Sequence, residues 1–162
     1  MRSFVIKNQK LFTAKLFADT LFDSFLLCDA TFMTNQTYNI DGHVLTDYYD
    51  SESDKPAETY TTWANSRPIC FQMIKGKRLP VFFKVVLTVS SGALKKILAD
   101  SGCAISPTDV EGVYLNIHYK EGTLFCTSGI SLKTFSMDKT FPNYWDELVS
   151  SFFVKNGFEF EN

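Results

Sequence analysis

The sequence predicts an α+β fold in which helices cover an antiparallel sheet. Three observations lead to this class. The chain has 162 residues, of which 45% are hydrophobic and 15% aromatic, which is enough for the core of one domain. Segments with an apolar period of two alternate with segments whose apolar side chains recur every three or four residues. Turn-forming residues separate these segments, and no apolar run approaches the ~18 residues that a membrane-spanning helix needs. We therefore expect no membrane partner.

In the first half of the chain, the apolar spacing predicts four strands and two helices. Asn35-Gln36 and Asp41-Gly42 both have turn chemistry, and Asp41-Gly42 is a strong hairpin signal. Residues 50–58 are polar and contain Pro56, so we expect a loop there. The predicted elements are a strand at residues 3–6, a helix at 9–19, strands at 25–34, 37–40 and 43–49, and a helix at 63–74.

The second half shows a similar succession of patterns. Its clearest helix covers residues 144–155, where five apolar side chains recur at helical spacing: Trp145, Leu148, Val149, Phe152 and Phe153. Glu121-Gly122 and Ser128-Gly129 are the predicted turns. The other predicted elements are a buried strand at residues 80–90, a helix at 93–100, and strands at 113–120, 123–127 and 130–137.

The two halves match locally, which predicts an internal duplication. Residues 16–20 and 97–101 align at an offset of 81 positions, and Trp63 aligns with Trp145 at an offset of 82. We therefore predict a single domain made of two degenerate repeats, residues 1–78 and 79–162, each strand-helix-strand-strand-strand-helix and related by a pseudo-two-fold axis. A chance match between amphipathic helices is the alternative. The element order resembles one domain of a DNA sliding clamp and the duplicated saddle of the TATA-binding fold.

The net charge of −2 conceals separate acidic and basic segments. Residues 47–58 contain five acids and one base, whereas residues 59–96, the basic block, contain seven bases and no acid. Residues 97–162 are acidic again, with nine acids against four bases. A cluster of cations of this kind is typical of a surface that binds phosphates or acidic partners.

The basic block supplies the candidate binding residues. Its densest part is Lys75-Gly76-Lys77-Arg78, a connection between a predicted helix and a buried strand. It lacks the spacing of a phosphate-binding P-loop, and it could equally be a solvated connector whose lysines stabilise the helix end. Lys95 and Lys96 lie on the outward face of the next predicted helix. The candidate residues for binding nucleic acid or an anion are Arg67, Lys75, Lys77, Arg78, Lys95 and Lys96.

Catalytic and metal-binding patterns are not found in the sequence. Its four cysteines, Cys28, Cys70, Cys103 and Cys126, are spread singly, which is typical of free thiols rather than of zinc or redox pairs. No nucleophile elbow, metalloprotease motif or carboxylate pair is present. In Asp41-Gly42-His43 an acid stands near a potential base, but the trio also has the chemistry of a turn. We therefore predict no catalytic residue, no metal ligand and no cofactor.

Three segments carry a resemblance to a known family: residues 67–78, residues 132–135, and the predicted helix that begins around Trp145-Asp146-Glu147. With these segments, the chain resembles a small family of uncharacterised bacterial proteins over nearly its whole length. This resemblance implies a stand-alone cytoplasmic domain. It transfers no catalytic residue, because that family has no assigned activity.

Our leading hypothesis from the sequence is a cytoplasmic, non-enzymatic module whose basic block contacts nucleic acid or an acidic protein surface. The start of the chain lacks the long apolar stretch of a secretion signal. One alternative is an enzyme or small-ligand protein with a pocket between sheet and helices, using Arg67, His43 or Asp41. A third is a homo-oligomer formed through the last residues, because Phe158 and Phe160, shortly before Asn162, alternate as in a strand that could join a neighbour's sheet or close the protein's own.

Overall fold

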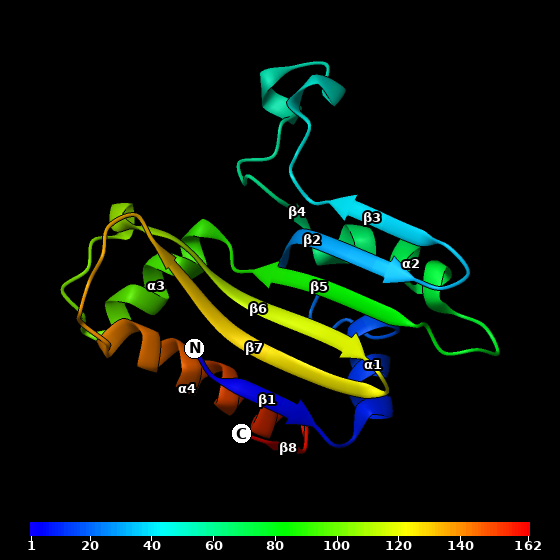
Figure 1. Ribbon diagram of the computed structural model, residues 1–162. Coiled ribbons are helices and arrows are strands. Elements are labelled where there is room, and N and C mark those ends of the chain that lie inside the picture. Colours follow the sequence, from blue (N-terminus) through cyan, green and yellow to red (C-terminus); the bar gives the residue numbers. More distant parts are fainter.

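The computed structural model describes all 162 residues and shows an open antiparallel sheet of eight strands with four α-helices (Figure 1). The strands lie in the order β3-β2-β5-β6-β7-β1-β8, and the short β4 pairs with β2. The strands are β1 (Ser3–Ile6), β2 (Leu26–Met33), β3 (Thr37–Asp41), β4 (Thr61–Thr62), β5 (Phe82–Thr88), β6 (Val110–Lys120), β7 (Thr123–Leu132) and β8 (Phe160–Glu161). The helices are α1 (Gln9–Phe17), α2 (Trp63–Ile74), α3 (Ser91–Ser101) and α4 (Thr140–Lys155).

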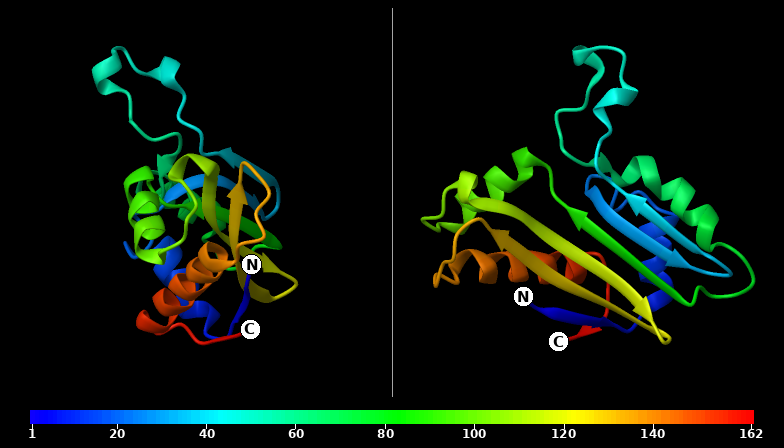
Figure 2. Two further views of the ribbon diagram at one scale, coloured as in Figure 1. Left: turned by 90° about the vertical axis from the view of Figure 1, so that its left-hand side faces the viewer. Right: turned by 45° about the horizontal axis from the view of Figure 1, so that its top comes forward.

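The helices cover one face of the sheet, and the core lies between them (Figure 2). In β5 the buried side chains Phe83, Val85 and Leu87 alternate with half-buried ones, as expected for a strand with a single covered face. Buried side chains from all four helices join the same cluster of 26 residues, so both halves of the chain share one core. None of the helices combines the length and apolar character needed to cross a bilayer.

Aromatic side chains dominate this core. Phe12 of α1 packs against Phe153 of α4 with ring centroids 5.7 Å apart and against Phe158 at 4.7 Å. Both tryptophans bury their rings and satisfy their indole N–H groups. Trp63 donates to the backbone oxygen of Leu16 at 2.9 Å, and Trp145 donates to that of Tyr114 at 3.1 Å.

The predicted α+β class is confirmed, and the Asn35-Gln36 turn joins β2 to β3 as expected. The predicted hairpin at Asp41-Gly42 is wrong, since β3 ends there and residues 43–49 form no strand beyond a single bridge between His43 and Tyr60. Gly42 is required for a different reason. A Cβ atom there would lie 1.7 Å from the backbone oxygen of Leu27, because the chain passes directly against β2.

Ser128-Gly129 is not a turn either. Both residues lie inside β7, paired with Leu115 and Tyr114 of β6, so the separate strand predicted at residues 130–137 does not exist. The buried Ser128 is satisfied within the sheet, where its hydroxyl bonds the carboxylate of Asp146 on α4 and accepts the backbone N–H of Arg2 at 3.0 Å. A polar residue can therefore sit in a central strand without ending it.

The internal duplication and the clamp-like order remain predictions. In both halves a strand and a helix are followed by a hairpin, and a longer helix comes later. The sheet joins them unequally, however: β1 pairs with β7 and β8, whereas β5 pairs with β2 and β6.

Two segments outside the core bear on function. Residues 44–59, the acidic arm, project from the body between β3 and β4 (Figure 1). Residues 158–162 remain within their own chain, since Phe158 is buried in the core and β8 pairs with β1. The end of the chain therefore pairs within its own sheet, and an oligomer formed through these residues stays a prediction.

Candidate functional site: an apolar cleft with a basic rim

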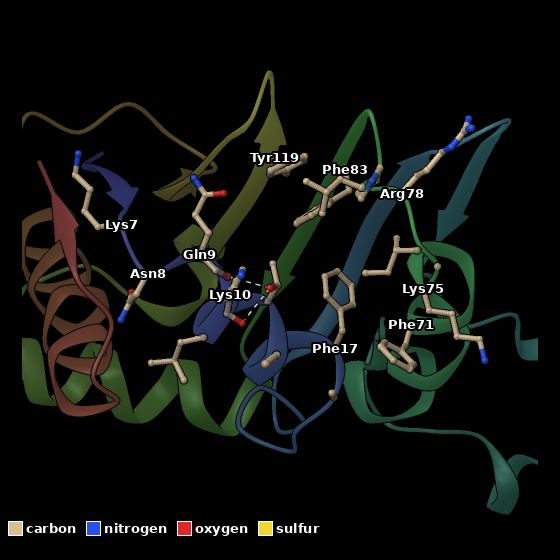
Figure 3. A pocket seen from close by; sticks show the side chains of 18 residues that line it. Lys7, Asn8, Gln9, Lys10, Phe17, Phe71, Lys75, Arg78, Phe83 and Tyr119 are labelled. Carbon is tan, nitrogen blue, oxygen red and sulfur yellow. Dashed lines mark hydrogen bonds between the residues drawn. The ribbon is translucent and has the colours of Figure 1, made fainter.

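A cleft of about 950 Å³ opens between α1, α2 and the neighbouring ends of β5 and β6 (Figure 3). Residues 7–18, which form the turn after β1, helix α1 and the residue that follows it, line one side. Residues 71–80, from the last turn of α2 and the loop after it, line the other. Phe83 of β5 and Tyr119 of β6 lie between the two sides. The volume falls within the roughly 300–1,000 Å³ of ordinary ligand pockets.

The floor of the cleft is aromatic. Phe83 and Tyr119 stack with ring centroids 5.5 Å apart and planes inclined by 15°, and Phe17 of α1 meets Phe83 edge-on at 5.4 Å. Phe71 at the α2 side and Leu11 at the α1 side are 37% and 38% exposed, which is high for large apolar side chains. The cleft therefore offers apolar surface on a rigid support.

The charged residues of the cleft are all cations: Lys7, Lys10, Lys75 and Arg78. Lys7 pairs with Glu161 at 2.8 Å, while the other three make no ion pair. The amides of Asn8 and Gln9 are already occupied, since they donate to the backbone oxygens of Gly157 and Gly122. The polar groups left for a ligand are thus mainly ammonium and guanidinium groups, whose charged ends reach solvent at the rim.

The loop after α2 places two of these cations. The helix ends at Ile74, and the N–H of Lys75 still donates to the backbone oxygen of Phe71 at 2.9 Å. Gly76 follows with φ +151°, a backbone conformation that other residues rarely adopt. The loop is then fixed at its far end, where the N–H of Val81 donates to the oxygen of Met33 at 2.8 Å. Between these anchors Lys77, Arg78 and Leu79 are exposed.

The six predicted binding residues do not form one surface. Lys75 and Arg78 line the cleft, and Lys77 lies beside it on the same loop. Lys95 and Lys96 are exposed on α3, at the other end of β5. That strand has seven residues, which corresponds to a span of roughly 20 Å.

Arg67 is not a free cation in the structure, and its role as a binding residue stays a prediction. Its side chain bonds both carboxylate oxygens of Asp23, and each of the two side chains is about one-fifth exposed, at 19% and 20%. These hydrogen bonds raise the pKa of Arg67 further above its ordinary value. Lys84, another member of the basic block, pairs with Asp29 at 2.7 Å.

Sequence reasoning missed the α1 side of the cleft, including Lys7, Lys10 and Leu11. A local signal did exist, because Leu11 and Phe71 are large apolar residues that the helix spacing leaves near the edge of the buried face. No local pattern, however, places residues 7–18 beside residues 71–83. That proximity depends on the long-range pairing of β1 with β7.

The alternative catalytic pair lies elsewhere, at the base of the acidic arm. His43 Nδ1 is 2.6 Å from Asp41 Oδ1, and hydrogen bonds from the backbone and ring of His43 lower the pKa of Asp41. Both side chains are mostly exposed, and neither lines the cleft. Burial raises the pKa of the nearby Cys28 thiol to about 12, which keeps it protonated and unreactive at neutral pH. Nowhere do three His, Cys, Asp or Glu side chains gather as metal ligands would.

Comparison with known proteins places the chain in a family but adds no activity. Residues 15–161 match the model of a family described as "Family of unknown function (DUF5721)". No curated protein and no solved structure matches the chain significantly. The match covers β2 to β8, both sides of the cleft except residues 7–14, and the acidic arm. The chain therefore belongs to this family of unknown function.

Proposed function

We propose that this protein is a non-enzymatic binding module whose cleft takes an acidic protein segment that also carries a large apolar side chain. The observation that carries the proposal is the composition of the cleft: an aromatic floor, four cations at the rim, of which only Lys7 is in an ion pair, and no acidic residue in the lining. A ligand with carboxylates on either side of an apolar side chain matches both features at once.

The floor and the rim would contribute differently to binding. Exposed ion pairs contribute about 0–1 kcal/mol each, because water already solvates both partners. Apolar surface removed from water contributes roughly 25 cal/mol per Å², so the floor supplies most of the affinity. The cations supply selectivity and speed of association through their long-range field.

The chemistry of the cleft supports binding rather than catalysis. Its lining contains no His, Cys, Asp, Glu or Ser side chain, and the Thr13 hydroxyl donates to the backbone oxygen of Gln9 at 2.9 Å. The titratable groups that remain in the lining are cations and the phenol of Tyr119, none of which is in its basic form near neutral pH without a large change of pKa.

An acidic protein segment fits better than nucleic acid. Duplex or single-stranded nucleic acid binds along a continuous track of cations, and affinity grows with the number of phosphates contacted. Here the cleft cations are separated from Lys95 and Lys96 by the length of β5, and Arg67 and Lys84 are neutralised by Asp23 and Asp29.

A small amphipathic anion is the second candidate, favoured by the volume and by the predominance of apolar lining. A medium-chain fatty acid would place its alkyl chain over Phe83 and its carboxylate near Lys10, Lys75 or Arg78.

Fluorescence anisotropy with a labelled short peptide that alternates Asp with Leu and Tyr tests the proposal. We expect the double variant Lys75→Glu, Arg78→Glu to bind the peptide at least about tenfold more weakly, which corresponds to ~1.4 kcal/mol. The matched control is Lys95→Glu with Lys96→Glu, which makes the same charge change on α3 and should leave binding unchanged.

Competition then separates the candidates. Dodecanoate and unlabelled peptide are each added to the complex with the labelled peptide. If dodecanoate displaces the labelled peptide at a lower concentration than the unlabelled peptide does, the small anion is the favoured ligand. Binding of a single-stranded oligonucleotide that equally needs Lys75 and Lys95 would favour nucleic acid. Absence of peptide binding, or an equal loss in the α3 control, overturns the proposed function.

A further inference from the structure

We propose that the partner of the cleft is the acidic arm of a second copy of this chain. The inference rests on the proposed function, because it identifies the acidic, apolar segment that the cleft takes. Residues 44–59 have five acids against one base, while the lining of the cleft has four bases and no acid. The two surfaces of the same protein are thus complementary in charge.

The arm also carries the apolar side chains that the floor requires. Leu45 is 77% exposed and Tyr48 is 83% exposed, among the highest values for large apolar side chains in the molecule. No residue of the arm is buried. Exposed leucine and tyrosine among carboxylates form a surface whose apolar area has no partner within its own chain.

The arm is ordered by its own short turns and by hydrogen bonds at its base. Two short 3₁₀ turns, Thr46–Tyr48 and Glu52–Asp54, follow one another, and Lys55 bonds Glu52 at 2.6 Å. Its base is held where the N–H of Val44 donates to the oxygen of Thr59 and where Glu58 accepts the N–H and hydroxyl of Ser91. A preordered segment loses less conformational entropy on binding. Asp47 and Asp50 make no ion pair or side-chain hydrogen bond and remain available for a cation.

The arm does not lie near the cleft of its own chain. Glu58 at its base contacts Ser91 at the start of α3, which follows one end of β5, whereas the cleft lies at the other end, beside Phe83. The views in Figures 1 and 2 show the arm projecting away from the sheet. An arm that fills a cleft of this kind therefore comes from another molecule. Two copies that exchange arms would form a closed dimer.

Sedimentation velocity at low ionic strength tests this contact in the whole protein. We expect wild type to associate at tens of micromolar protein and to dissociate as salt is added. The cleft variant, Lys75→Glu with Arg78→Glu, and the arm variant, Asp47→Lys with Asp50→Lys, should each be monomeric. Their equimolar mixture should associate again, because the unaltered acidic arm of the cleft variant can then bind the unaltered basic cleft of the arm variant. The Lys95→Glu, Lys96→Glu control should associate like wild type.

Several outcomes overturn the inference. One is wild type that stays monomeric at about 100 μM, the range in which a weak specific contact would show. Another is a mixture that stays monomeric although circular dichroism shows both variants folded. A third is an unchanged association when Leu45→Ser and Tyr48→Ser remove the apolar side chains of the arm. If wild type is monomeric while the Asp, Leu and Tyr peptide still binds the cleft, the proposed function stands and only the second copy is excluded as its partner. If the cleft does not bind the peptide either, both the proposed function and this inference are excluded.

Discussion

The guanidinium of Arg67 binds the carboxylate of Asp23 through two hydrogen bonds, from Nε at 2.7 Å and from Nη2 at 3.1 Å. This pair joins α2 to the segment between α1 and β2. Arg67, the first cation of the basic block, therefore forms an ion pair within its own chain. The planar guanidinium of Arg can donate two parallel hydrogen bonds to one carboxylate, whereas the ammonium of Lys cannot, so this position favours Arg.

Loss of the Arg67–Asp23 pair should destabilise the fold without weakening ligand binding. We expect Arg67→Ala and Asp23→Ala each to lower the free energy of unfolding by about 1–3 kcal/mol, because each change leaves a partly buried charge without its partner. Urea unfolding of the single and double variants gives the coupling energy. Lys55→Ala, which removes a pair with the highly exposed Glu52 on the arm, is the control and should change little. A coupling energy near zero would contradict the role assigned to Arg67.

Gly42 should tolerate no side chain. Gly42→Ala places a Cβ against the backbone oxygen of Leu27, which cannot rotate away, so we expect a loss of more than about 2 kcal/mol. Gly92 on α3 is the matched control, since nothing lies within 4 Å of the added atom. Gly92→Ala should be neutral or stabilising by up to about 1 kcal/mol. Thermal unfolding of both variants measures the difference in stability. Similar unfolding midpoints would contradict the close approach of Gly42 to the backbone of Leu27.

Burial should protect three of the four cysteines from thiol reagents. It raises the pKa of Cys28 and of Cys70 to about 12 and that of Cys126 well above its ordinary value, so these thiols stay protonated and covered. At pH 8 we expect Ellman's reagent to label Cys103 first and to reach all four only in denaturant. Cys103→Ala should remove the fast phase, and a fast phase that survives this change would refute the assignment.

The same thiols should make stability fall in alkali. The unfolded chain loses its thiol protons near pH 9, whereas folded Cys70 keeps its proton up to about pH 12. Stability from this group is therefore complete below pH 9 and is lost as the pH rises toward 12, by at most about 1.4 kcal/mol per pH unit. Cys70→Ala should flatten the alkaline decline of the unfolding free energy relative to wild type. An identical slope in both proteins would show that the thiol ionises equally in the two states.

His118 should make stability fall in acid. Its ring stacks on Phe125 at 5.0 Å, and burial, with a smaller contribution from Lys84, lowers the pKa of His118. The unfolded chain takes up this proton near pH 6.5, so the contribution is complete above that pH and is lost as the pH falls through it. We expect the stability difference between wild type and His118→Gln to shrink from pH 7.5 to 5.5. A constant difference across this range would contradict the lowered pKa.

Local residue patterns were sufficient for most helices and strands. The alternation in Phe82–Thr88 and the helical spacing around Trp145 have the periods of the structures they form, because burying one face imposes that period on neighbouring residues. The wrong turn predictions concern residues that can serve either in a turn or inside a sheet. Asp41-Gly42 and Ser128-Gly129 have the composition of turns, yet Gly42 allows close backbone packing and Ser128 is satisfied by Asp146 inside the sheet.

The sequence by itself determined the fold class, the covered face of most elements and the existence of a basic block beside an acidic segment. Only the tertiary structure decided which cations lie close together. It neutralised Arg67 with Asp23, separated Lys95 and Lys96 from the loop by the length of β5, and brought Lys10 opposite Lys75. The physical reason is that backbone periodicity reports contacts within a few residues. A binding site is made by strand pairings such as β1 with β7, whose partners lie more than a hundred residues apart.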